Sequence, residues 1–154
     1  MKWAWLFTLA LVVVPRQAYA DPHMPDHIVA VGPSVAYAHA RDLGGGLLYG
    51  VDATGSYQIL WASGGLRVFE TFEADERRFL PYLEVGVWLV VNIGAGVTID
   101  VTGKENEATG PHLFLGLPFP AAESVFAEPY YRATFTEAGT LHEGGALVKW
   151  TKWE

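Results

Sequence analysis

Hydrophobic and polar residues alternate along much of the chain, most regularly over residues 91–102. The odd-numbered positions of this segment are apolar: Val91, Ile93, Ala95, Val97, Ile99 and Val101. The even-numbered positions are polar or small: Asn92, Gly94, Gly96, Thr98, Asp100 and Thr102. A period of two predicts a β-strand with one apolar and one polar face. The pattern recurs in at least five segments, each about as long as a strand that crosses a lipid bilayer.

Turn-forming residues divide the chain into eight segments of similar length. The expected strands are residues 29–40, 47–54, 59–72, 79–89, 91–102, 112–119, 125–135 and 141–153. Short connections predict that neighbouring strands are antiparallel. A tight turn is expected near residues 90–92, because one continuous strand there would leave seven, an awkward number for an up-and-down barrel. The pattern therefore predicts an all-β fold, an eight-stranded antiparallel up-and-down β-barrel.

The N-terminus has the features of a secretory signal peptide. Lys2 supplies a positive charge, residues 3–14 are almost wholly apolar, and Ala18-Tyr19-Ala20 matches a cleavage site. The apolar stretch is too short to span a bilayer as a helix. We expect a signal peptide at residues 1–20 cleaved after Ala20, a flexible leader at 21–28, and one barrel domain at 29–154.

Composition narrows the class of protein. The chain has a net charge of −7, which argues against a nucleic-acid partner, and it has no cysteine for thiol chemistry or disulfides. After Ala20 no apolar run approaches the 18 residues of a membrane helix. A mature chain of this kind could cross a membrane only as a closed barrel.

The charged residues of the expected strands lie almost entirely on one face. The alternating positions on that face are occupied by Asp52, Arg67, Glu84, Asn92, Asp100, Glu128, Arg132, Glu143 and Lys149. The opposite face is formed by the apolar residues Val51, Leu66, Val68, Leu83, Val85, Val87, Leu113, Leu115, Leu117, Ala146 and Val148. A soluble barrel would turn the apolar face inward, and a membrane barrel would turn it outward.

Three features favour the membrane barrel. The polar face is rich in glycine, which suits a crowded bore better than a solvated surface. Only three lysines follow the signal peptide, fewer than a soluble surface usually carries. Aromatic residues of the apolar face gather at two levels: Phe72, Phe79 and Phe135 at one end, Phe119 and Trp150 at the other. The bore is then expected to be polar and filled with side chains.

The whole mature chain resembles the small bacterial outer-membrane β-barrels of the OmpA/OmpX type. Its closing strand, residues 144–150, is similar to their C-terminal assembly signal, with Trp150 or Trp153 as the anchoring aromatic in place of a terminal one. The resemblance implies an integral protein of the Gram-negative outer membrane, inserted by the outer-membrane assembly machinery. With the signal peptide it implies Sec export, and outer-membrane lipids and lipopolysaccharide as partners of a monomer.

No catalytic, cofactor or metal site emerges from the sequence. His23 would be third in the mature chain, but Pro22 has no N–H to give to a copper site. His39, His112 and His142 lie near one expected rim, where a metal or catalytic site is an alternative to ordinary boundary histidines. The only serines after the signal peptide are Ser34, Ser56, Ser63 and Ser124, and none is paired with histidine at a telling spacing.

The favoured function is therefore non-enzymatic: a structural or surface-interaction protein without an open pore. One alternative is a soluble exported barrel that binds a small apolar ligand, as lipocalins and avidin do. The other is an outer-membrane enzyme that modifies lipid A. Narrow bores need paired charges, so we expect a network whose hub is Arg132, paired with Glu128. Its members are Arg67, Glu84, Glu128, Arg132 and Lys149.

Overall fold

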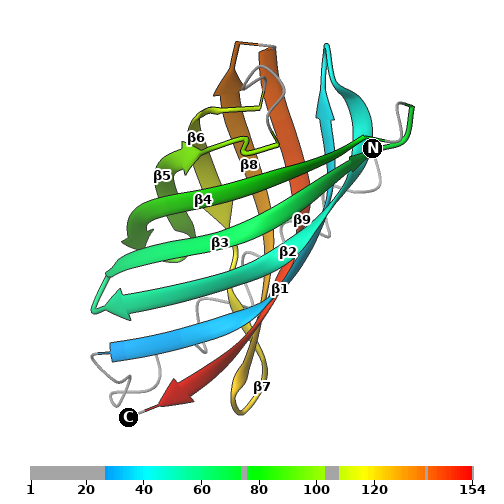
Figure 1. The fold of residues 1–154 in the computed structure, drawn as a ribbon. Coiled ribbons are helices and arrows are strands. Elements are labelled where there is room, and N and C mark those ends of the chain that lie inside the picture. The colour runs from blue at the N-terminus through cyan, green and yellow to red at the C-terminus, as the bar shows by residue number, and fades with distance from the viewer. Residues whose placement is uncertain (1–26, 74–75, 103–107, 138, 154) are drawn as a thin grey trace, which may run out of the picture.

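Nine β-strands make up the computed structural model, which describes residues 27–73, 76–102, 108–137 and 139–153 (Figure 1). The signal peptide, its cleavage site after Ala20 and most of the leader lie outside the described residues. The strands are β1 (His27–Ala40), β2 (Gly44–Tyr57), β3 (Leu60–Thr71), β4 (Arg77–Trp88), β5 (Asn92–Thr98), β6 (Gly110–Gly116), β7 (Phe119–Ala122), β8 (Val125–Thr136) and β9 (Gly139–Trp153). In the described part of the chain, no helix is long and apolar enough to cross a bilayer.

Eight of these strands close into a barrel. Each pairs antiparallel with its neighbour in the order β1-β2-β3-β4-β5-β6-β8-β9, and β9 returns to β1. The closing ladder runs from Ile28 opposite Trp153 to His39 opposite His142. Closure leaves no free sheet edge in the barrel wall, so its backbone groups pair within the wall. The predicted eight-stranded antiparallel barrel is confirmed.

The predicted turn between the fourth and fifth barrel strands is also confirmed. β4 ends at Trp88 and β5 begins at Asn92, and the Leu89 N–H donates to the Val91 carbonyl at 3.0 Å. At the same end of the barrel, β2 and β3 are joined by two residues, of which Gln58 has a φ of 51°. A left-handed residue suits the tight turns that match the twist of a hairpin.

The predicted C-terminal end of the sixth strand, residues 112–119, is wrong. β6 stops at Gly116, and Phe119–Ala122 forms β7, which pairs only with β8. Pro118 and Pro120 have no N–H, so they interrupt a ladder that would otherwise continue. β7 and the start of β8 form a small hairpin at the end of the barrel where β9 also finishes (Figure 1).

The two faces of the wall differ as the alternation predicts. The outward side chains are mostly apolar and highly exposed, up to 68% for Leu83 and 64% for Val85. Most exposed aromatics lie towards the two ends: Tyr37, Phe72, Phe79 and Phe135 at the end with the long loops, Tyr57, Phe119 and Trp150 at the other. Tyr49 and Tyr131 are exposed nearer the middle of their strands.

The inward face is mixed rather than uniformly polar. Near the long-loop end, Leu48, Phe69, Leu80 and Leu141 are fully buried and belong to one hydrophobic cluster. Charged side chains occupy the middle of the barrel, and aromatic rings lie beyond them towards the other end. The expectation of a polar bore therefore needs this correction: an apolar layer covers the charges on the loop side.

Candidate functional site: a buried charge network

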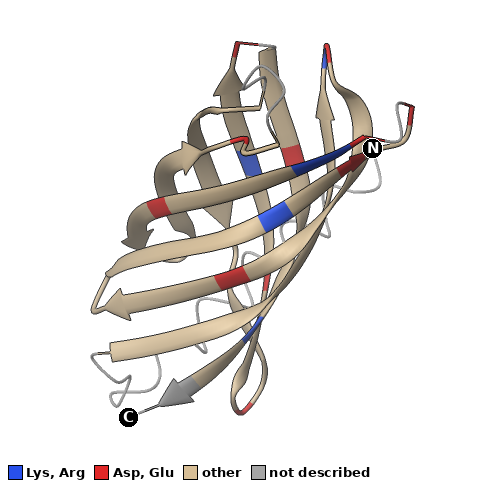
Figure 2. Cartoon of the chain, viewed as in Figure 1, with Lys and Arg blue, Asp and Glu red and all other residues tan. Residues whose placement is uncertain are grey.

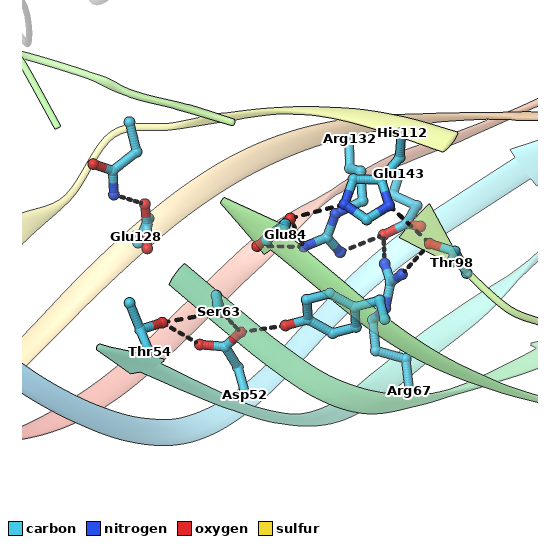
Figure 3. A network of polar contacts seen from close by, with 12 residues as sticks. Asp52, Thr54, Ser63, Arg67, Glu84, Thr98, His112, Glu128, Arg132 and Glu143 are labelled. Atoms are coloured by element: carbon cyan, nitrogen blue, oxygen red, sulfur yellow. Dashed lines mark hydrogen bonds and ion pairs between the residues drawn. The ribbon is translucent and has the colours of Figure 1, made fainter. Parts of the chain in front are cut away.

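The charged side chains inside the barrel come from strands on opposite sides of its wall. Figure 2 shows acidic and basic positions at intervals along strands that are otherwise uncharged. The buried ones are Asp52, Arg67, Arg78, Glu84, Asp100, Glu128, Arg132, Glu143 and Lys149. Their parity places them on the inner face. Figure 3 shows the ion pairs that join Arg67 to Glu143 and Arg132 to Glu84 and Glu143.

Two arginines and two glutamates form the centre of this network. Arg132 on β8 reaches both oxygens of Glu84 on β4, the shorter contact at 2.9 Å, and Oε2 of Glu143 on β9 at 3.3 Å. Arg67 on β3 donates to the same Glu143 oxygen. The Arg132 guanidinium also lies over the Tyr82 ring, 4.5 Å from its centroid. A planar guanidinium that donates to two carboxylates and stacks on an aromatic ring uses the geometry in which arginine binds carboxylates best.

A histidine extends this centre. His112 Nε2 lies 3.0 Å from Glu84 Oε2, and Nδ1 lies 3.0 Å from the Thr98 hydroxyl oxygen. Arg67 donates to that hydroxyl at 3.0 Å, which leaves the Thr98 O–H free to donate onward to His112 Nδ1. A neutral imidazole protonated at Nε2 then satisfies every bond in the chain.

The hydrogen-bonded series of Thr98, His112 and Glu84 resembles a nucleophile, a base and an acid. A substrate, however, has no access to it. The Thr98 side chain is fully buried, and His112 is 1% exposed. Nucleophilic catalysis needs a reacting atom beside the hydroxyl. In this structure the hydroxyl is therefore closed to a substrate, and the three side chains supply hydrogen bonds within the barrel interior.

A second cluster surrounds Lys149 on β9. Its ammonium lies 2.8 Å from Asp52 Oδ1 and 3.3 Å from Glu128 Oε2, and it donates to the Thr54 hydroxyl at 2.8 Å. Asp52 also accepts from Ser63 and Tyr82, so Tyr82 links the two clusters.

The predicted pairing of Arg132 with Glu128 is wrong. The partners of Glu128 are Lys149 and the Asn92 amide. Arg132 and Glu128 share a face of one strand four residues apart, which separates them by about 13 Å at the rise of an extended chain. Of the five residues expected to form one network, Arg67, Glu84 and Arg132 lie in the central cluster and Glu128 and Lys149 in the second.

A third pair lies at the loop end of the barrel. Arg78 Nη1 donates to Asp100 Oδ2 at 2.9 Å, and Thr102 donates its N–H to the other oxygen at 3.0 Å. Burial alone would raise the pKa of Asp100, which lies beyond the end of β5. The bonds from Thr102 and Arg78 outweigh that effect and lower it.

The three rim histidines of the sequence analysis do not meet. His39 and His142 face each other across the β1–β9 ladder on the outer surface, where His142 Nδ1 lies 2.5 Å from the Tyr131 hydroxyl, whereas His112 is inside. No three histidine or acidic side chains in the described ranges are arranged to hold a metal ion.

Sequence reasoning missed the neutral members of the network. Thr98 and His112 hold the central cluster together, and Tyr82 bridges to the second, yet none was assigned to it. The alternation pattern does mark these three residues, because they occupy inward-facing positions like the charged residues.

No protein-family profile matches the chain, and no curated protein matches it in sequence. Solved structures match its fold. Neisserial surface protein A aligns with a TM-score of 0.52 at 15% identity, covering 81% of this chain and 96% of its own. Ail, the attachment invasion locus protein of Yersinia pestis, aligns with a TM-score of 0.51 at 10% identity, covering 84% and 100%. Its complex with the heparin analogue sucrose octasulfate gives 0.52 at 8%. The fold is thus that of small eight-stranded outer-membrane β-barrels, as the sequence pattern predicted.

Proposed function

We propose that the chain is an integral protein of a Gram-negative outer membrane, with a structural or surface-interaction role and without catalytic activity or an open pore. Sec export with cleavage after Ala20 and insertion by the outer-membrane assembly machinery belong to the same proposal. Proteins with a similar fold include a neisserial surface protein and an attachment invasion locus protein, which supports a location at the cell surface.

One observation carries the proposal: the exposed wall of the barrel is apolar. Leu66, Leu83, Val85, Leu113 and Leu115 are each about half exposed or more. Exposed apolar patches on soluble proteins seldom exceed a few hundred Å², whereas this one surrounds a closed sheet. In a bilayer the same surface contacts acyl chains, and the exposed aromatics near both ends lie at the level of the headgroups.

The buried interior supports a role without conduction. Arg67, Arg132, Glu84 and Glu143 are all nearly inaccessible to solvent and meet in the middle of the lumen. An eight-stranded barrel is just wide enough for side chains to fill. An ion would have to displace paired charges to pass.

The binding of a sulfated sugar by Ail is not proposed for this chain. Among the described residues that join strands at the long-loop end, acidic side chains predominate, with Glu73, Glu76 and Glu137. A polyanion would be repelled there. Outer-membrane lipids and lipopolysaccharide, bridged by divalent cations, suit that charge better and are the partners we propose, for a monomeric barrel.

The runner-up remains a soluble exported barrel with a small apolar ligand inside. Charged side chains in the middle of the lumen disfavour an apolar ligand there, because their pairing would have to be broken.

Cell fractionation tests the proposal. We expect the protein in the outer-membrane pellet, released only by detergent, and no steady nanosiemens-scale conductance from the pure protein in planar bilayers. Recovery in a clear aqueous extract would contradict the membrane location. A large, stable channel would contradict the filled interior.

A further inference from the structure

A small cavity lies at the end of the barrel where the turns are short, below the Lys149 cluster. Its volume is about 60 Å³. Trp61, Trp88 and Phe126 supply aromatic surface to its lining. Its polar atoms come from Glu128, Asn92, Thr151 and also from Lys149, whose ammonium already pairs with Glu128 at 3.3 Å. The cavity takes no part in the membrane role proposed above.

The charges around this cavity do not balance. Arg67 and Arg132 balance Glu84 and Glu143 in the central cluster, and Arg78 balances Asp100 at the loop end. Lys149 alone faces both Asp52 and Glu128. Among the buried residues that the structure describes, one negative charge is therefore left without a cation.

Hydrogen bonding places that excess charge on Glu128. Asp52 already accepts from Thr54, Ser63, Tyr82 and Lys149, which saturates its two oxygens. Glu128 accepts one bond from the Asn92 amide and a longer one from Lys149, at 3.3 Å. Two lone pairs of its buried carboxylate remain open beside the cavity.

Two further acceptors line the cavity without a hydrogen-bond partner among the described residues. They are Thr151 Oγ1, on a side chain more than nine-tenths buried, and Asn92 Oδ1. Buried acceptors without donors are costly, so a ligand that brings donors is favoured beside these two atoms. The Trp61 Nε1–H, a donor without a partner among the described residues, also lines the cavity. Aromatic faces beside them attract a cation.

We propose that this cavity binds a small primary alkylammonium cation. The three N–H donors of the ammonium match the Glu128 carboxylate, Asn92 Oδ1 and Thr151 Oγ1. The first methylene groups pack against Trp61 and Trp88. At roughly 30 Å³ for each water displaced, the cavity holds the head group and one or two carbons, so a longer alkyl chain extends from the end of the barrel.

The folded protein in zwitterionic detergent provides the test. Propylammonium chloride is titrated in place of sodium chloride at constant ionic strength. Binding is followed by NMR, from the chemical shifts of the tryptophan indole N–H groups. 1-Propanol, which has the same shape without the charge, is the matched ligand. We expect saturable shifts at Trp61 and Trp88, none at the outward Trp150, and at least tenfold weaker binding of 1-propanol.

Variants test the assigned carboxylate. Glu128→Gln is expected to bind propylammonium no better than 1-propanol, whereas Glu70→Gln, at the opposite end of the barrel, keeps the wild-type affinity. Equal affinity of the wild type for the two ligands, shifts confined to Trp150, or undiminished binding by Glu128→Gln would each overturn the proposal. The comparison of ligands on the wild type stands even if Glu128→Gln does not fold.

Discussion

Removal of Arg132 is the perturbation that most directly tests the central ion-pair cluster. In Arg132→Ala, Glu84 keeps only His112 and Glu143 keeps only Arg67. Both carboxylates stay buried. Breaking a buried pair by deleting one partner typically costs 3–5 kcal/mol, so we expect the free energy of unfolding to fall by about 3–5 kcal/mol.

A double-mutant cycle assigns this loss to a specific contact. Arg132→Ala combined with Glu84→Gln should recover part of it, with a coupling energy of roughly 1–3 kcal/mol, because the two side chains touch. Arg132→Ala combined with Glu128→Gln is the matched control, and its effects should add within about 0.5 kcal/mol. The assay is urea unfolding of the refolded barrel, followed by the gel mobility of the folded form. Equal coupling in the two cycles would refute the pairing described here.

Three further predictions concern the wall, the packing and the loop end. Val97→Arg should destabilise the barrel in lipid vesicles by roughly 2–4 kcal/mol, measured by urea titration, because Val97 is exposed on the outer wall, which contacts acyl chains under the proposed membrane location. Gly94→Ala should cost about 1–3 kcal/mol and alter the near-ultraviolet circular dichroism, since its new Cβ would lie 2.6 Å from the Trp61 ring, whereas Gly144→Ala meets nothing within 4 Å and should change neither. Asp100 has a lowered pKa in the folded barrel, so its stabilisation is present above its ordinary pKa of 3.8 and lost as the pH falls further. The deficit of Asp100→Asn in urea unfolding should therefore shrink below that pH, and a deficit that does not depend on pH would exclude this cause.

The strands and faces of the barrel could be predicted because alternation is a local property. Inward and outward positions follow from parity alone, so Arg67 and Val97 were assigned to opposite faces without any knowledge of strand pairing. The aromatic residues near the ends followed in the same way, from distance along each strand. The short strand β7 was missed because two prolines end the ladder at a point that alternation does not mark.

The partners inside the barrel could not be predicted from parity. Which inward residues meet depends on strand tilt and on the stagger of the ladders around the barrel, and these are properties of the closed sheet. Arg132 therefore meets Glu84 from β4 rather than Glu128 from its own strand. The apolar layer of Leu48 and Phe69 shares the inward face with the charged residues, so the presence of charges on that face does not by itself predict a uniformly polar interior.

Thiol labelling at Val97 tests the central claim, an apolar outer wall in contact with lipid, most directly. The chain contains no cysteine, so each variant carries a single thiol. In the native membrane, Val97→Cys should resist a charged, membrane-impermeant maleimide, whereas Ala122→Cys on the exposed β7 hairpin should react readily once the reagent reaches that end. We expect this difference to disappear after unfolding in urea. Equal and rapid labelling of both variants in the folded, membrane-bound protein would contradict it.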